Sequence, residues 1–213
     1  MPQPSLITYL ILYLALHSLL ASLPVKAWAQ RMFGDSVMRW YRLTYNVLAV
    51  VLLAPLPLLL AFLPSTTLYI VPEPWRWLML GGQGVALMLM LVTLRQTDMG
   101  YFLGLAQLRG TSGGTEGLAD PSVGDDALIV NGLYAYVRHP LYTFSLLFIW
   151  LSPAMTANLL AVFVLFTIYF YVGSIHEEHR LVRVFGETYR AYQRRVPRLF
   201  PRLLPRPRHE TVR

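Results

Sequence analysis

Residues 140–180 read PLYTFSLLFIWLSPAMTANLLAVFVLFTIYFYVGSIHEEHR, two apolar runs around a short break. The second run, 157–175, has 19 uncharged residues, which is enough for a helix to cross the hydrocarbon core of a bilayer. The first run, 141–151, has 11 residues and is too short to cross alone. It therefore either extends backward through 134–137 or pairs with 157–175 as a hairpin, with Pro153 as the helix breaker between them.

Upstream, three further segments are long and apolar enough to span a membrane: 5–23, 44–63 and 75–94. The whole chain of 213 residues is 55% hydrophobic and only 14% charged, well below the roughly 25% charge of soluble domains. The first segment lacks a basic flank and a small-residue cleavage site, so we expect a retained span rather than a signal peptide. The sequence predicts an all-α integral membrane protein with about five transmembrane helices, the fourth and fifth forming a hairpin.

Basic residues indicate the orientation of these spans. With five crossings, 17 of the 18 Lys and Arg residues fall in the loop after the first span, the loop after the third span and the C-terminal tail. The positive-inside rule then places the N-terminus outside and the C-terminus in the cytoplasm, and we expect a bacterial inner membrane. Anionic membrane lipids explain the net charge of +7 without a nucleic-acid partner.

The chain is expected to form one domain, 1–213, with distinct parts. These parts are a three-helix N-terminal part (1–95), a cytoplasmic loop (96–131), a hairpin and tail helix (132–201) and a basic tail (202–213). Apolar residues recur at helical spacing between 181 and 196, which predicts a cytoplasmic amphipathic helix after the last span. Gly186 lies inside it and is expected to mark a bend.

Two polar and aromatic clusters flank the hairpin, so its topology brings them together. The first, 132–142, reads GLYAYVRHPLY, and the second is the glutamate pair at 177–178. Pro140 suits the first turn of a helix, which puts Arg138 and His139 beside the free N–H groups of that turn. Such a site fits a carboxylate or phosphate. The alternative interpretation is a basic membrane anchor with a belt of tyrosines.

The glutamate pair also allows two interpretations. Solvated ion pairs with the tail arginines are the commoner arrangement. In the other interpretation, Glu177 faces the anion site and binds a cationic group. A ligand with both a carboxylate and an amino group would satisfy both clusters.

Several other patterns bear on metal, cofactor and redox chemistry. The absence of cysteine excludes disulfides, Cys-ligated metals and a cysteine nucleophile. His176 and His179 do not have the i, i+4 spacing of a zincin helix, and we predict no metal site. The stretch 81–84 (GGQG) lacks dinucleotide-loop spacing and favours close helix packing. His17 lies at membrane depth and is a functional candidate, although we favour a neutral imidazole satisfied by Ser18 or by a carbonyl.

The two clusters together resemble the isoprenylcysteine carboxyl methyltransferase superfamily, over roughly residues 127–201. The first matching pattern consists of Gly132, Tyr134, Arg138, His139, Pro140 and Tyr142. The second consists of Glu177, Glu178, Leu181, Phe185, Gly186, Tyr189, Tyr192, Val196 and Pro197. The N-terminal half resembles a narrower branch, the NnrU-type proteins and methanethiol S-methyltransferases, at His17-Ser18, 41–46 (YRLTYN) and 102–107 (FLGLAQ).

This resemblance implies a membrane methyltransferase that uses S-adenosylmethionine. The acceptor would be a small lipophilic molecule, most simply a thiol, that enters laterally from the bilayer. The carboxylate and ammonium of the cofactor suit the two clusters, and tyrosine faces can stabilise its sulfonium. The resemblance implies a cofactor pocket lined by Ala127, Leu128, Ile129, Tyr134, His139, Pro140, Leu141 and Tyr142, with Glu177 at its polar end.

Arg138 and His139 are the catalytic candidates. A cation such as Arg138 would lower the pKa of an acceptor thiol. His139 is the nearest candidate for a general base, but holding the cofactor is the role we favour for it.

Three other functions are alternatives to thiol methylation. Prenylcysteine carboxyl methyltransferases usually carry an arginine four residues before the first glutamate, whereas this chain has Gly173, which favours a thiol over a carboxylate acceptor. NADPH-dependent sterol reductases share an Arg-His-Pro-x-Tyr region, but their pattern has Asn after Pro and a tail Cys, and here Leu141 follows and Cys is absent. The third alternative, a non-catalytic NnrU-like membrane protein, is disfavoured by the intact motifs at 138–140 and 177–178.

Overall fold

The computed structural model describes residues 1–97, 99–108, 123–124 and 127–201, and every structural statement below refers to these. The predicted loop segment 110–117 and the predicted basic tail 202–213 lie outside the described residues. The long helices are α1 (Pro4–Ala21), α2 (Leu23–Leu53), α3 (Pro55–Phe62), α4 (Trp75–Gln96), α7 (Pro140–Trp150) and α8 (Ala157–Arg195). Shorter elements are α5 (Met99–Leu103), α6 (Leu105–Leu108), the 3-10 helix η1 (Gly132–Ala135), and strands β1 (Thr67–Ile70), β2 (Val123–Gly124), β3 (Ala127–Leu128) and β4 (Ala154–Thr156).

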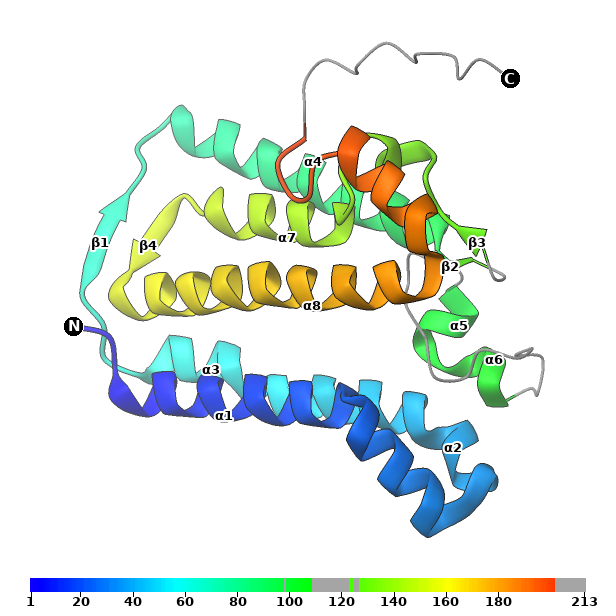
Figure 1. Ribbon diagram of the computed structural model, residues 1–213. Coiled ribbons are helices and arrows are strands. Elements are labelled where there is room, and N and C mark those ends of the chain that lie inside the picture. The colour runs from blue at the N-terminus through cyan, green and yellow to red at the C-terminus, as the bar shows by residue number, and fades with distance from the viewer. Residues whose placement is uncertain (98, 109–122, 125–126, 202–213) are drawn as a thin grey trace.

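Helix α8 runs through the middle of the molecule (Figure 1). It contacts α1 on one side and α7 on the other, and α7 in turn packs along α4. Leu6, Leu10 and Leu14 follow one another at a spacing of four residues, which puts them on one face of α1. This face packs into a core with Leu56, Met155, Val162 and Phe163.

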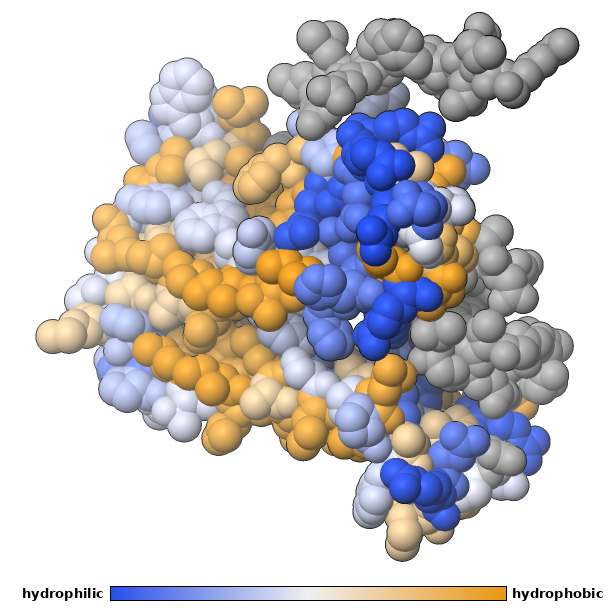
Figure 2. Space-filling model, viewed as in Figure 1, coloured by the Kyte–Doolittle hydropathy of each residue, from blue (hydrophilic) through white to orange (hydrophobic). Residues whose placement is uncertain are grey.

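Four helical stretches are long and apolar enough to cross a membrane: Pro4–Ala21, Ser36–Phe62, Trp75–Gln96 and α8. Each overlaps one of the four long spans predicted from the sequence. Figure 2 shows hydrophobic side chains over the middle of the molecule and hydrophilic ones gathered over the last part of α8. The protein is therefore an all-helical membrane protein in its described long elements.

The second span differs from its predicted bounds because α2 begins well before it. Gly34 has φ 73°, so α2 bends there, and the apolar stretch starts at Ser36 rather than at the predicted residue 44. Helix α3 begins at Pro55 directly after Ala54, which keeps helical dihedrals (φ −54°, ψ −31°), so α2 and α3 form one continuous apolar stretch and the kink expected from the prolines stays a prediction.

Helix α7 starts at Pro140 and does not extend backward, since 132–135 form the separate helix η1. The turn between α7 and α8 contains β4, which pairs antiparallel with β1. This two-stranded sheet ties the hairpin to the loop before α4 and was missed by the sequence analysis. Its short strands carry no clear alternation of polar and apolar residues.

Close helix packing was predicted from the GGQG stretch, and the structure shows that the partner of α4 is α7. A Cβ on Gly82 would lie 2.8 Å from Leu151 Cδ1, and Gln83 Nε2 donates a hydrogen bond of 2.9 Å to the Phe148 carbonyl. Gly82 therefore lets the two helices approach each other, as the small-residue pattern indicates. Gly81 and Gly84 have no described atom within 4 Å of a built Cβ and do not contribute to this contact.

The tail does not form a helix of its own at the membrane exit. Helix α8 continues from the apolar run through the glutamates, and it bends only at Gly186, where φ is +54°. The bend predicted at Gly186 is thus confirmed. Beyond it, the final turns fold back toward the start of α7 (Figure 1).

Candidate active site

Backbone hydrogen bonds join the start of α7 to the segment that follows α8. The Arg138 amide donates to the Pro197 carbonyl at 2.9 Å, and the His139 amide donates to the Arg198 carbonyl at 3.2 Å. One turn further, the Thr143 hydroxyl donates to the Leu199 carbonyl at 2.7 Å. The two clusters predicted to meet across the hairpin are therefore in direct contact.

Glu178 is the centre of this contact. Arg138 Nε and Nη2 each lie 2.8 Å from Glu178 Oε1, while Glu178 Oε2 accepts from Gln193 Nε2 and Arg198 Nη2, both at 3.0 Å. Arg138 Nη1 also donates to the Gln193 and Val196 carbonyls, at 2.9 and 2.7 Å. The Glu178 side chain is only 3% exposed. We name Arg138, Glu178, Gln193 and Arg198 the Glu178 network.

The Glu178 carboxylate stays charged in this buried position, which lies past the apolar run 157–175. Burial alone would raise its pKa, but hydrogen bonds from His139 and Arg198 and the charges of Arg138 and Arg198 outweigh burial and lower the pKa to about 2. A buried carboxylate is tolerated because its partners satisfy it.

His139 lies between the two carboxylates. Its Nε2 is 3.2 Å from Glu178 Oε1, and its Nδ1 is 3.6 Å from Glu177 Oε2. Tyr142 stacks on the imidazole with ring centroids 5.5 Å apart and an interplanar angle of 6°. The Tyr142 hydroxyl donates to Glu177 Oε2 at 3.0 Å, so the orientation of Glu177 is set from two sides.

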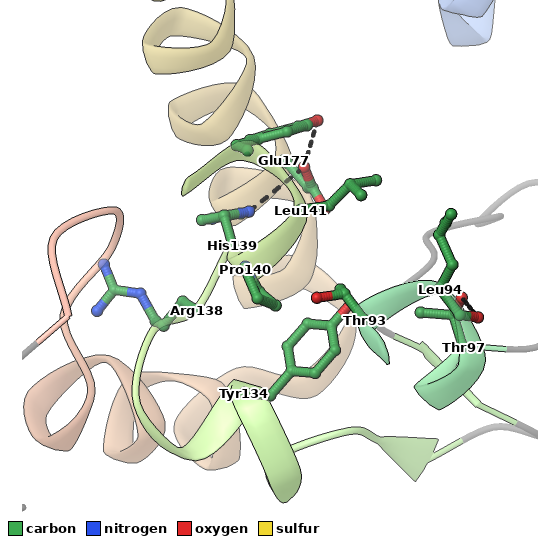
Figure 3. Close-up of a pocket in the computed structure, with 10 residues that line it drawn as sticks. Thr93, Leu94, Thr97, Tyr134, Arg138, His139, Pro140, Leu141 and Glu177 are labelled. Atoms are coloured by element: carbon green, nitrogen blue, oxygen red, sulfur yellow. Dashed lines mark hydrogen bonds and ion pairs between the residues drawn. The ribbon is translucent and has the colours of Figure 1, made fainter. Parts of the chain in front are cut away.

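A pocket opens beside this group, between α4, η1, α7 and α8 (Figure 3). The Glu177 side chain is 17% exposed, compared with 3% for Glu178, so Glu177 is the more accessible of the two carboxylates. In Figure 3 the Arg138 side chain points away from Glu177, toward the loop after α8. The lining residues are Thr93, Leu94, Thr97, Tyr134, Arg138, His139, Pro140, Leu141, Tyr142 and Glu177.

Most residues expected at the cofactor pocket are brought together here, namely Tyr134, His139, Pro140, Leu141, Tyr142 and Glu177. Two others, Leu128 and Ile129, lie outside the lining. Leu128 instead packs against Leu181 and the tyrosines of the last part of α8. The Ala127 side chain is outside what the structure describes.

Thr93, Leu94 and Thr97 line the pocket from the end of α4 and were missed by the sequence analysis. The two threonines are four residues apart, so they share one helix face just where the apolar run ends. That spacing was the available signal. Their hydroxyls donate to the Leu89 and Leu94 carbonyls, which leaves oxygen lone pairs as acceptors.

Tyr134 is held in the pocket wall by η1. Its carbonyl accepts a hydrogen bond of 2.6 Å from the buried Tyr192 hydroxyl. At the start of η1, Gly132 has φ +58°, and the next amide, Leu133 N, donates to Gln96 Oε1 at 3.2 Å. The end of α4 and the last part of α8 thus both position this short helix.

Replacing Gly132 with alanine should destabilise the protein. A Cβ here would overlap the Gln96 amide, and a residue with a side chain is strained at this positive φ. We expect a loss of about 1.5–3.5 kcal/mol: backbone strain of about 1–2 kcal/mol, and about 0.5–1.5 kcal/mol for the hydrogen bond from Leu133 N that is lost when the flexible Gln96 side chain moves aside. Thermal unfolding in detergent measures it. The matched control is Gly84→Ala, where the new Cβ meets open space inside α4 and helix propensity should raise stability by up to about 1 kcal/mol. A Gly132→Ala protein as stable as the wild type would contradict the strain argument.

Comparison with known proteins identifies a set of relatives with one activity in common. No protein-family model matches the chain, and no solved structure matches it. Methanethiol S-methyltransferase 2 of Bradyrhizobium diazoefficiens is 33% identical over 199 residues, which cover 90% of this chain and 70% of the relative. Two shorter matches are also methanethiol S-methyltransferases. The enzyme of Pseudomonas deceptionensis is 44% identical over 75 residues, which cover 35% of this chain and 29% of the relative. The enzyme of Crocosphaera subtropica is 46% identical over 68 residues, which cover 32% of this chain and 27% of the relative.

Proposed function

This chain belongs to the methanethiol S-methyltransferase family, and from that premise we propose that it transfers a methyl group from S-adenosylmethionine to the sulfur of a small thiol such as methanethiol. The observation that carries the proposal is the match at 33% identity over 90% of the chain. The pocket between Glu177 and the start of α7 supports it, because its chemistry suits a zwitterionic ligand.

The residues of the pocket fit S-adenosylmethionine group by group. Glu177 can bind its ammonium, and the backbone N–H of Leu141, in the first turn of α7, can bind its carboxylate. The aromatic ring of Tyr134 can stabilise a sulfonium. When bound, this cosubstrate supplies an electrophilic methyl group. The chain supplies position and exclusion of water.

Arg138 and His139 both act at this site, and we propose positioning roles for them. Arg138 directs its N–H groups at Glu178 and at two carbonyls, so it holds the start of α7 against the last part of α8. His139 holds Glu177 and Glu178 apart at a fixed spacing and stacks on Tyr142. This differs from the expectation that Arg138 acidifies the acceptor thiol.

A thiol acceptor agrees with the surroundings of Gly173. In prenylcysteine carboxyl methyltransferases an arginine near the substrate carboxylate takes this position. Here a Cβ at Gly173 would meet no described atom within 4 Å, so open space lies where that arginine side chain would start. An uncharged acceptor suits that space better than a carboxylate does.

We further propose five membrane crossings, with α7 as the short fourth and the apolar run of α8 as the fifth. The N-terminus would be outside and the C-terminus in the cytoplasm of a bacterium, because basic residues alternate between loops. Residues 132–201 would form the cofactor-binding part of a single domain, with a cytoplasmic amphipathic helix between 181 and 196. The acceptor would enter laterally from the bilayer.

The test is methylation by the detergent-purified protein supplied with S-adenosylmethionine and methanethiol. We expect dimethyl sulfide in the headspace and S-adenosylhomocysteine in solution in equal amounts. S-adenosylmethionine and S-adenosylhomocysteine should each raise the unfolding temperature of the protein. A ligand present at one hundred times its Kd stabilises the folded state by about 2.7 kcal/mol. Stabilisation by NADPH alone, or adenosyl binding without methylation of any thiol, would refute the proposed function.

A further inference from the structure

Three basic residues gather where α1, α2 and α8 pack together, across α8 from the pocket described above. Lys26 lies in the first turn of α2, and its amide donates to the Ser22 carbonyl at 3.1 Å. Arg42 lies in the second part of α2, after the bend at Gly34, and Arg180 lies on α8. We name Lys26, Arg42 and Arg180 the basic cluster.

The end of α1 is tied to the second part of α2 by side chains. The Tyr41 hydroxyl donates to the Leu20 carbonyl, one residue before α1 ends, at 2.7 Å. One turn further along α2, the Tyr45 hydroxyl lies 2.7 Å from Nε2 of His17. Arg42 follows Tyr41 directly, so it lies beside the junction between α1 and α2.

Helix α8 packs along the same end of α1. The Ser18 hydroxyl donates to the Tyr169 hydroxyl at 3.2 Å, so it does not satisfy His17 as expected. Arg180 follows Tyr169 by about three helical turns, so the two side chains share one face of α8. Because this face contacts α1, Arg180 is directed toward the junction of α1 and α2 as well.

The Lys26 ammonium is half-buried and has no anionic partner among the described residues. Burial is the largest cause that lowers its pKa, and the charges of Arg180 and then Arg42 lower the pKa further, so both arginines are near enough to repel it. Taking a cation out of water is costly unless an anion is close to it. The described part of the chain places like charge beside Lys26, so this position is suited to an anionic ligand.

The basic cluster lies at the depth of the lipid headgroups. Arg180 follows the apolar run 157–175 by about 7.5 Å of helix rise, and Lys26 comes the same number of residues after the span Pro4–Ala21. The headgroup layer adds about 5–8 Å on each side of the hydrocarbon core. Trp28, which follows Lys26 closely, is exposed, as expected of an aromatic side chain in this layer. A lipid phosphate would therefore lie level with the basic cluster.

We propose that the basic cluster binds the phosphate of an anionic phospholipid, such as phosphatidylglycerol, at the Lys26 ammonium. This inference does not depend on the proposed methylation, because the cluster and the methyl-donor pocket lie on different sides of α8. Lys26 donates charge-assisted hydrogen bonds to the phosphate oxygens, and the two arginines add attraction instead of repulsion once the anion is present. The choline of phosphatidylcholine brings a further cation, which the cluster repels. Inorganic phosphate lacks the acyl chains that hold a lipid at this depth.

The test is lipid binding by the delipidated protein in an uncharged detergent, measured by native mass spectrometry. The wild type should bind phosphatidylglycerol more tightly than phosphatidylcholine. Lys26→Met should weaken phosphatidylglycerol binding about 10- to 150-fold, the effect of losing a hydrogen bond from a charged group. The matched control is Arg31→Met, an exposed arginine on the same helix, where we expect a loss of less than about fivefold. Lys26→Arg keeps the charge and should bind like the wild type.

A second readout uses the wild-type protein, because Lys26 is the single lysine of the sequence. After reductive methylation with ¹³C-formaldehyde, the NMR signal that is missing from Lys26→Arg reports this ammonium alone. Phosphatidylglycerol should shift the signal and raise the pKa of Lys26, since a nearby anion favours the charged form. Phosphatidylcholine and inorganic phosphate should leave the signal unchanged.

Unfolding temperatures separate lipid binding from a role in packing. Without lipid, Lys26→Met should unfold at or above the wild-type temperature, because it removes a repelled cation, whereas phosphatidylglycerol should stabilise the wild type more than the variant. Equal losses of phosphatidylglycerol binding in Lys26→Met and Arg31→Met, or destabilisation by Lys26→Met without lipid, would overturn the site. Equal binding of phosphatidylcholine, or the same NMR shift with inorganic phosphate, would overturn the anionic lipid as its ligand.

Discussion

Replacing Glu178 with alanine should destabilise the protein by about 3–5 kcal/mol, the usual cost of removing one partner from a buried ion pair. Glu178 is the acceptor for Arg138, Gln193 and Arg198, and its carboxylate is almost wholly buried. Without it the Arg138 guanidinium, itself only 9% exposed, would keep a buried charge with carbonyl partners alone. The measurement is thermal or denaturant unfolding in detergent, with methyl-donor binding lost along with the fold.

The matched control is Glu187→Ala on the same helix. Glu187 pairs with Arg190 at 3.6 Å and Arg194 at 3.7 Å, but its side chain is 75% exposed. Solvated ion pairs contribute little, so we expect a change within about 0.5 kcal/mol. If Glu178→Ala fails to fold at all, Glu178→Gln keeps the volume and one acceptor oxygen, and it should fall between Glu178→Ala and the wild type. Equal stabilities of Glu178→Ala and Glu187→Ala would show that the Glu178 network does not hold the tail.

The difference between Glu177 and Glu178 illustrates what sequence can and cannot reveal. Both were expected at the end of the last span, and the hairpin was expected to bring them to Arg138 and His139, which it does. Adjacent residues on a helix point about 100° apart, so one of the pair had to face inward. Which one does so depends on how the last part of α8 folds back after Gly186 and places Gln193 and Arg198 around Glu178. That packing carries no local sequence signal.

The membrane spans could be predicted from the sequence, whereas the full lining of the pocket could not. Length and hydropathy alone predicted the four long helices, because a bilayer imposes a minimum apolar length. The contribution of Thr93 and Thr97 to the pocket arises from the packing of α4 against α7, two helices far apart in sequence. Conversely, Leu128 was placed at the pocket by resemblance, while here it packs beneath the last part of α8. Contacts between distant segments are set by packing rather than by periodicity.

The Glu177→Gln variant should fold almost as well as the wild type but bind the methyl donor poorly. Glu177 lies at the pocket and contacts Tyr142 and His139. The side-chain hydrogen bond from Arg198 that helps to hold the tail is accepted by Glu178 instead. A hydrogen bond to a charged group is worth about 1.5–3 kcal/mol, so losing the charge that binds the ammonium should weaken S-adenosylhomocysteine binding about 10- to 150-fold.

Isothermal titration calorimetry of S-adenosylhomocysteine measures this change, with unfolding temperature without ligand as the check on folding. Glu187→Gln, the exposed glutamate on the same helix, is the control and should bind like the wild type. The pair of variants separates two functions in adjacent residues: Glu178→Ala should lose stability first, and Glu177→Gln should lose affinity first. If Glu177→Gln bound S-adenosylhomocysteine as tightly as the wild type, the ammonium of the methyl donor would have to be bound by another group, and the assignment of the pocket would be wrong.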